Sequence, residues 1–170
     1  LLEFKMLDEA NAPKLLLPVR VERSEEGATR KKFVSQVPEG SEILFESLES
    51  DEDLPKYSRP YLVFKTPALT GDVLQDARVS IGDFNEPLVS VTFDSKGAKE
   101  FGQLTTENVG KFMAIVLDGT VYSAPRITEP ILGGRAQITG NFTTTEANDL
   151  AIVLRAGALP APMKTLQDLT

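Results

Sequence analysis

Two adjacent glycines and a cation, Gly133, Gly134 and Arg135, stand in the stretch ILGGRAQITGNF, ahead of an expected strand and helix. Glycines and a cation directly before a helix can bind a phosphate, because the N–H groups of the first helical turn converge on the anion. Here the strand-like AQITG separates the glycines from the next helix, and no G-x-x-x-x-G-K-[ST] pattern is present. The spacing therefore favours a glycine-hinged connection between Pro125 and Arg135 over the alternative, a phosphate loop.

Catalytic chemistry has few candidates, because the sequence contains no histidine and no cysteine. That composition excludes a Ser-His-Asp triad, a Cys-His dyad, a thiol redox centre and an ordinary zinc or haem site. A carboxylate hydrolase could use Glu146 and Asp149, but acids at i and i+3 of one short helix do not bracket a scissile bond well. Glu146 is better explained as half of a capping box with Thr143. We therefore predict that the chain is not an enzyme and needs no cofactor or metal.

Charge and hydropathy limit the possible partners. The 170 residues carry a formal net charge of −7, with 41% hydrophobic and 25% charged side chains. An acidic chain without lysine and arginine clustered between aromatics attracts phosphate backbones weakly, so we expect no nucleic-acid partner. No run approaches the roughly 18 apolar residues that a membrane helix requires. Any membrane attachment is expected only through segments absent from this chain.

The first 66 residues give the weaker structural signals. LLEFKML, LLLPVRV and PYLVFKT alternate apolar with polar residues or are rich in β-formers, and each predicts a strand. The run EGSEILFESLESDEDLPK holds seven carboxylates before any cation, and we interpret it as a solvated helix face or loop. A calcium site is the alternative, but the run lacks the glycine and the ligand spacing of an EF-hand.

Beyond Thr66 the pattern is clearer. RVSIGDFNEPLVSVTF predicts two short strands around a turn, and a helix capped at Asp94 or Ser95 follows. Thr143 and Glu146 form a T-x-x-E capping box that predicts the start of a second helix. The apolar face of that helix is expected to consist of Ala147, Leu150, Ala151 and Leu154.

A tight hairpin is expected at Asp118 and Gly119, which stand between two apolar runs. This dipeptide suits a two-residue type I′ turn, because both central residues must adopt positive φ. A tight turn would place Val116 opposite Val121. Ile115 would then lie opposite Tyr122.

The order strand, strand, helix, strand, strand, strand, helix, strand predicts an α+β fold. We expect a two-layer sandwich, in which a largely antiparallel sheet carries two helices packed on one face.

Several segments together resemble one bacterial family. LTGDVLQDARV and VSVTFDSKGAKEFGQLTTENVGKFMAIVLDGTVYSAPRITEPILGGRAQITGNFTTTEANDLAIVLRAGALPAP look like the head of the first periplasmic domain in the SecD family of protein-export membrane proteins. The joint occurrence of ENVGK, AIVLDG, SAP, the double glycine, ITG and LRAGALPAP carries this resemblance. It implies three parts: 1–7, a strand entering from the periplasmic base; 8–66, a variable acidic segment with short strands or helices; and 67–170, an α+β head core with an exit strand. The family's membrane helices, its D-L-K-G-G segment and its intramembrane carboxylate have no counterpart in this sequence.

The resemblance implies an accessory subunit of the Sec translocase, in the RND superfamily. Such a subunit works with SecF beside the SecYEG channel and uses the proton gradient to promote late steps of protein export. It is a bacterial inner-membrane protein, and the domain considered would lie in the periplasm. In that family the head is thought to bind the emerging unfolded preprotein.

A surface that holds unfolded chain without sequence selectivity needs exposed apolar side chains or a strand edge. We select Tyr122, Ile127, Ile131 and Leu132 as candidates, with Gly133 and Gly134 as a hinge; the alternative is that these are ordinary packing residues. A different function also stays open. The chain could be the substrate-binding module of another extracytoplasmic exporter, with a lipid or a small molecule as its ligand.

Overall fold

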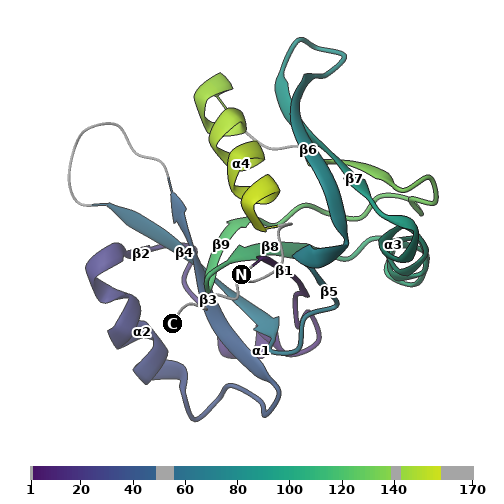
Figure 1. The fold of residues 1–170 in the computed structure, drawn as a ribbon. Coiled ribbons are helices and arrows are strands. Elements are labelled where there is room, and N and C mark those ends of the chain that lie inside the picture. The colour runs from purple at the N-terminus through teal and green to yellow at the C-terminus, as the bar shows by residue number, and fades with distance from the viewer. Residues whose placement is uncertain (1, 49–55, 139–142, 158–170) are drawn as a thin grey trace, which may run out of the picture.

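The fold is taken from a computed structural model (Figure 1), and the structure describes residues 2–48, 56–138 and 143–157. The strands are β1 (Leu2–Met6), β2 (Val21–Glu22), β3 (Ser41–Leu48), β4 (Tyr57–Phe64), β5 (Leu69–Thr70), β6 (Leu74–Ile81), β7 (Pro87–Phe93), β8 (Met113–Leu117), β9 (Thr120–Ser123) and β10 (Arg135–Ile138). The helices are α1 (Ala12–Leu15), α2 (Glu26–Phe33), α3 (Ser95–Glu107) and α4 (Thr144–Gly157), with 3-10 turns η1 (Arg23–Glu25) and η2 (Gly71–Val73).

Two sheets form the framework of the described chain. The larger has the strand order β2-β4-β3-β9-β8-β1-β5, and the smaller has the order β10-β7-β6. Neighbouring strands are antiparallel except β3 and β9, which are parallel. A bridge between Leu7 and Val63 joins the end of β1 to β4, although β3, β9 and β8 separate these strands in the sheet. The larger sheet therefore curls back on itself.

The main hydrophobic core joins the two sheets and both long helices. Phe4 and Ile115 enter it from the larger sheet, Phe93 from β7, Phe101 from α3 and Leu154 from α4. α4 packs against β6 and β7, whereas α3 contacts β5 and β7 (Figure 1). A single core thus fixes the smaller sheet to the larger one.

Two further clusters stabilise the curled sheet. α1 and α2 cover a core of Leu15, Phe33, Ile43, Phe45 and Leu62. The third cluster consists of Leu44, Val63, Ala114, Val116 and Val121. Most of these alternate along their strands with residues of the other two cores, so they lie on the opposite sheet face. The curl of the sheet itself buries that face.

Most elements beyond Thr66 were predicted correctly. α3 begins after Asp94, whose side chain accepts a hydrogen bond from the Gly97 backbone N–H at 2.7 Å. Asp118 and Gly119 have φ values of 49° and 82°, as the predicted tight turn between β8 and β9 requires. The α+β class and the largely antiparallel pairing are also confirmed.

Some local predictions were wrong. The strands are divided between two sheets, not collected in one. LLLPVRV forms the end of α1, a loop and the start of the short β2, because Pro18 interrupts a strand ladder. The first part of the acidic run forms β3, because Ile43 and Phe45 are buried on one side of it and Leu44 on the other; the part at 49–55 lies outside the described residues. A register shift after Ile115 places Ser123, not Tyr122, opposite that residue.

The stability of α4 tests its cap and its buried face separately. The backbone N–H of Thr143 donates to Glu146 Oε1 at 2.8 Å, and the backbone N–H of Glu146 donates to Thr143 Oγ1 at 3.1 Å. Thr143→Ala should therefore lower the free energy of unfolding by about 1 kcal/mol. Leu154 is fully buried, so Leu154→Ala should lower it by about 2–5 kcal/mol. Denaturant melts that gave equal losses for the two variants would contradict this packing.

Candidate functional site

A groove of about 710 Å³ lies beside the connection between β9 and β10. The smaller sheet lines it with Phe93 and with all four residues of β10. Ile115 of β8 lines it from the larger sheet, and Ile127 and Ile131 line it from the connection. The groove is therefore largely apolar and is bounded by both sheets.

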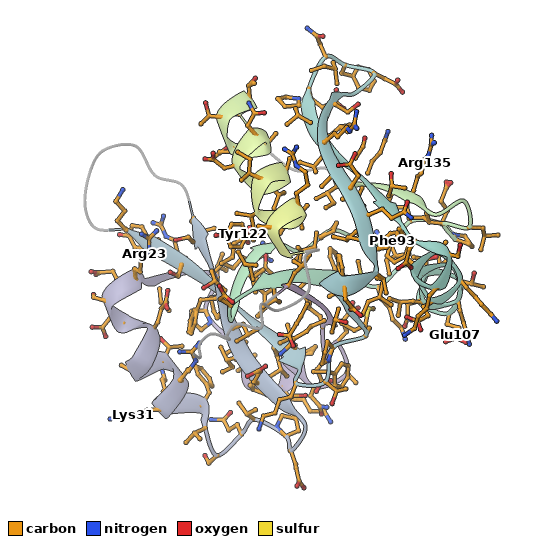
Figure 2. The ribbon with its side chains drawn as sticks, in the orientation of Figure 1. Arg23, Lys31, Phe93, Glu107, Tyr122 and Arg135 are labelled. Atoms are coloured by element: carbon orange, nitrogen blue, oxygen red, sulfur yellow. The ribbon has the colours of Figure 1, made fainter. Side chains whose placement is uncertain are left out.

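The candidate residues chosen from sequence fall into different environments. Ile127 is 5% exposed and belongs to the main core, and Ile131 is partly buried against that core. Leu132 is 73% exposed. Tyr122, on β9, is 41% exposed and does not line this groove; Figure 2 shows it away from Phe93 and Arg135. The structure thus brings Ile127 and Ile131 to one groove, with Leu132 next to it in sequence.

The two glycines of the connection differ in their surroundings. A Cβ on Gly133 would meet no atom within 4 Å, whereas one on Gly134 would lie 3.1 Å from the Cβ of Ala98 on α3. Gly134 also has a φ of +74° and accepts a hydrogen bond from Phe93 N at 2.8 Å. Ile131 N donates to Thr105 Oγ1 at 2.9 Å. Leu132 lies over α3, where a Cβ on Gly102 would be 3.1 Å from Leu132 Cδ2. Gly133 is therefore the point of the connection with the most room to move.

β10 is an edge strand of the smaller sheet. The hydrogen bond from Phe93 N to Gly134 O makes these two residues a hydrogen-bonded pair. In an antiparallel ladder such pairs alternate with pairs that share no hydrogen bond. Ala136 and Ile138 therefore point their backbone groups toward β7, and Arg135 and Gln137 point theirs away from it. Among the described residues no strand pairs with these outward groups, which form a strand edge at the groove.

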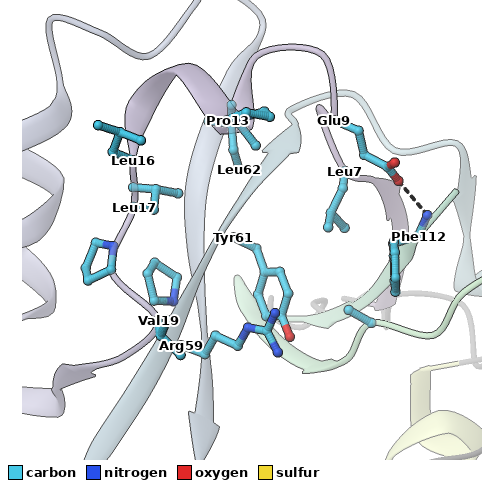
Figure 3. Close-up of a pocket in the computed structure, with 14 residues that line it drawn as sticks. Leu7, Glu9, Pro13, Leu16, Leu17, Val19, Arg59, Tyr61, Leu62 and Phe112 are labelled. Atoms are coloured by element: carbon cyan, nitrogen blue, oxygen red, sulfur yellow. Dashed lines mark hydrogen bonds between the residues drawn. The ribbon is translucent and has the colours of Figure 1, made fainter.

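A second groove, of about 580 Å³, was missed in the sequence (Figure 3). Leu16 and Val19 stand on one side of it and Phe112 on the other, with Tyr61 between them. Glu9 accepts a hydrogen bond from Phe112 N at 2.7 Å across one end. The signal was present in LLLPV, because a proline within an apolar run indicates an irregular segment as readily as a strand edge.

Buried polar groups of the larger sheet have partners that explain them. Lys5 is 6% exposed, and its Nζ lies 2.7 Å from Glu42 Oε2 and 3.7 Å from Glu3 Oε1. Asp8 is 1% exposed and accepts hydrogen bonds from Ser41 and Asn11. Burial raises the pKa of Asp8, but these hydrogen bonds outweigh it and hold the pKa below its usual value. These groups fix β1 to β3 and the turn before α1.

The half-buried carboxyl of Glu46 on β3 has a pKa shifted upward, opposite to the shift of Asp8. Burial raises the pKa of Glu46, although the Tyr61 hydroxyl donates to it at 2.9 Å and Arg59 is nearby. The Arg59 guanidinium lies 4.9 Å from the centre of the Tyr61 ring. Burial and the Glu46 charge raise the pKa of Tyr61 in turn. This trio accounts for the shifted pKa values without a substrate.

The described part of the chain contains neither a candidate metal site nor a candidate membrane-spanning helix. No group of three or more acidic side chains is placed to hold a metal ion there. None of the described helices combines the length and the apolar character needed to cross a bilayer. Gly133 and Gly134 are separated from the first turn of α4 by β10, which argues against a phosphate loop.

Comparison with known proteins gives consistent matches. A family model described as "SecDF, P1 head subdomain" matches residues 45–161. The protein translocase subunit SecD of Magnetococcus marinus is 47% identical over 147 residues, which is 86% of this chain and 28% of that protein. The SecD subunit of Calditerrivibrio nitroreducens is 60% identical over 112 residues, or 65% of this chain and 22% of that protein. The chain thus spans less than a third of the length of these relatives.

Solved structures agree with the sequence matches. A structure described as a membrane component SecDF that enhances protein export is 34% identical, with a TM-score of 0.56. The match covers 95% of this chain and 64% of that one. SecDF in a super-membrane-facing form gives the same identity and TM-score, over 95% of this chain and 19% of that one.

Glu42 and Glu46 lie on the same face of β3, and neutralising them should change the stability of the fold in opposite directions. Because the folded pKa of Glu46 is raised, its ionised form costs stability at neutral pH, and that cost disappears as the pH falls below the folded pKa. Glu46→Gln should therefore stabilise the chain at pH 7, and the gain should shrink in acid. Glu42→Gln should destabilise it by about 1–3 kcal/mol, because buried Lys5 loses its nearer partner. Chemical melts across this pH range that changed both variants in the same direction would contradict the assignment.

Proposed function

The chain belongs to the SecDF P1 head subdomain family, and from this premise we propose that it binds segments of unfolded preprotein during export. The full-length protein is then an inner-membrane subunit that uses the proton gradient to assist late steps of translocation. SecF and SecYEG are its partners, and this domain lies on the periplasmic side. The membership itself establishes only a head domain of a protein translocase subunit.

The observation that carries the proposal is the groove beside the outer edge of β10, which no strand of the described residues covers. The groove is lined by Phe93, Ile127 and Ile131, which suit apolar side chains of many kinds. A volume of about 710 Å³ accommodates a few residues of an extended chain.

Strand addition explains how such a site could avoid sequence selectivity. The outward N–H and C=O groups of Arg135 and Gln137 can pair with the backbone of an added strand, and every polypeptide has that backbone. Alternate side chains of the added strand would enter the groove, while the others would face solvent. Leu132 would add apolar contact at the rim, because most of its side chain is exposed.

The second candidate function is that of a substrate-binding module for a lipid or a small molecule in another exporter. The observation that favours it is the size of the two apolar grooves, about 580 and 710 Å³, which falls within the range of small-ligand pockets. Binding of a detergent-like amphiphile in place of polypeptide would support this alternative.

No catalytic role is assigned to the acidic residues of the described chain. Glu146 belongs to the α4 cap, and Glu42 pairs with Lys5. Asp8 is satisfied by its hydrogen bonds to Ser41 and Asn11. Each of these carboxyls has a structural function that accounts for its position.

Binding of a reduced, carboxymethylated polypeptide, which stays unfolded, tests the proposal. Gln137→Pro removes an outward N–H without touching the ladder to β7, and proline is tolerated on an edge strand. We expect this variant and Leu132→Ser each to weaken binding about fivefold, the equivalent of one hydrogen bond or a comparable apolar contact. Binding is measured by fluorescence anisotropy with a labelled polypeptide.

Two controls accompany this test. Ala136→Pro removes a hydrogen bond to β7, so it should destabilise the fold, whereas Gln137→Pro should leave the melting transition nearly unchanged. Ile81→Ser, on the distant hairpin between β6 and β7, removes an exposed apolar side chain and should leave binding unchanged. The proposal fails if Gln137→Pro and Leu132→Ser stay folded and bind the polypeptide as tightly as the parent chain.

A further inference from the structure

The segment of residues 12–34 has a charge opposite to that of the rest of the chain. We call it the basic lobe; it comprises α1, β2, η1, α2 and their connections. Its six cations are Lys14, Arg20, Arg23, Arg30, Lys31 and Lys32, and its three acids are Glu22, Glu25 and Glu26. The lobe therefore carries +3, whereas the whole chain carries −7 and the remainder −10. The net charge of the whole chain therefore gives no indication of this positively charged segment.

The cations of the basic lobe are available to a partner. All six are exposed, and within the part of the chain that the structure describes, the ion pairs are those of Lys5 and Arg78. Arg20 lies over the Tyr57 ring at 4.1 Å, and Arg30 over the Phe45 ring at 4.9 Å. Arg30 Nε also donates to the backbone carbonyl of Ile43 at 3.2 Å, which leaves its terminal nitrogens for a partner. Stacking on a ring orients a guanidinium but does not neutralise its charge.

Exposed aliphatic side chains stand among these cations. Leu16 and Val19 are 83% and 82% exposed, and they lie between Lys14 and Arg20 in the sequence. Val34, which follows α2 directly after Lys31, Lys32 and Phe33, is 69% exposed. Side chains this exposed protrude from the surface, and a flat partner can cover them more completely than a groove could.

Leu16 has an unfavourable backbone conformation and an exposed side chain. Leu16 ends α1 with φ 55° and ψ 47°, in the left-handed region. Glycine or asparagine usually occupies this position at the end of a helix, because a Cβ is unfavourable there. A leucine in this conformation loses stability and exposes apolar surface, which points to a role in binding.

We propose that the basic lobe docks on the surface of an anionic lipid bilayer. Leu16 and Val19 would enter the interface between head groups and acyl chains, and the surrounding cations would contact anionic head groups. The cations of α2 contribute over a Debye length of about 8–10 Å without touching the lipid. This surface uses other elements than the groove beside β10, so the two proposals can fail independently.

Flotation with lipid vesicles tests the electrostatic half of the proposal. The chain should float with vesicles made of equal parts phosphatidylglycerol and phosphatidylcholine, should not float with phosphatidylcholine alone, and should be released by high salt. Lys31→Glu with Lys32→Glu should lower the partition coefficient at least about tenfold, because the reversals change four charges, each worth roughly fivefold at the membrane surface and less when set back from it. The matched control is Lys96→Glu with Lys99→Glu on α3, which makes the same charge change at two other exposed lysines and should have little effect.

A fluorescent label tests the apolar half. The chain has no cysteine, so a polarity-sensitive dye can be attached at a single position by Leu16→Cys. Its emission should shift to the blue on the anionic vesicles. The control is Phe84→Cys, at a side chain that is 89% exposed but lies between Asp83 and Glu86, where anionic lipid is repelled; its emission should not change.

Three results would overturn the proposal. The first is flotation that does not depend on anionic lipid. The second is an equal loss of binding for the α2 and α3 charge reversals. The third is a dye at position 16 that ignores vesicles but responds to the unfolded polypeptide, which would identify the tip of the lobe as a wall of a polypeptide-binding groove.

Discussion

The packing of Phe93 holds the two sheets together. Its ring stacks on Phe101 of α3 with ring centres 4.5 Å apart, and it lies 6.3 Å from the ring of Phe4 on β1. All three side chains are at most 5% exposed. Because β1 is paired on both sides within the larger sheet, this contact fixes the smaller sheet and α3 relative to the larger sheet. The same three rings also line the groove beside β10.

That arrangement determines where a polypeptide could bind. β7 is the central strand of the smaller sheet, and it pairs with β6 along one edge and with β10 along the other. α4 packs against β6, whereas β10 borders the groove. The connection beside the groove is attached at Ile131 and at Gly134, and Leu132 lies over Gly102 of α3, so Gly133 is its least constrained residue.

The sequence predicted caps and turns better than it predicted how the strands and helices pack together. The Asp94 cap, the turn at Asp118 and the capping box of α4 depend on neighbouring residues, so residue type and spacing were sufficient. The division into two sheets depends on contacts such as that of Phe4 with Phe93, which are far apart in the chain and leave no periodic signal. β3 was misread because its carboxylates suggested solvent, whereas its apolar residues are buried on both faces. The second groove was missed because Pro18 was read as part of a strand, and the basic lobe was missed because the charge was summed over the whole chain.

The most direct test of the account follows single backbone amides of β10 by NMR hydrogen exchange, with and without the unfolded polypeptide. The amides of Ala136 and Ile138 already donate to β7 in the inferred ladder, and they should change little. The amides of Arg135 and Gln137 point outward, and they should become strongly protected when a strand is added. Protection confined to Leu16 and its neighbours, or binding that leaves Arg135 and Gln137 unprotected, would contradict strand addition at this edge.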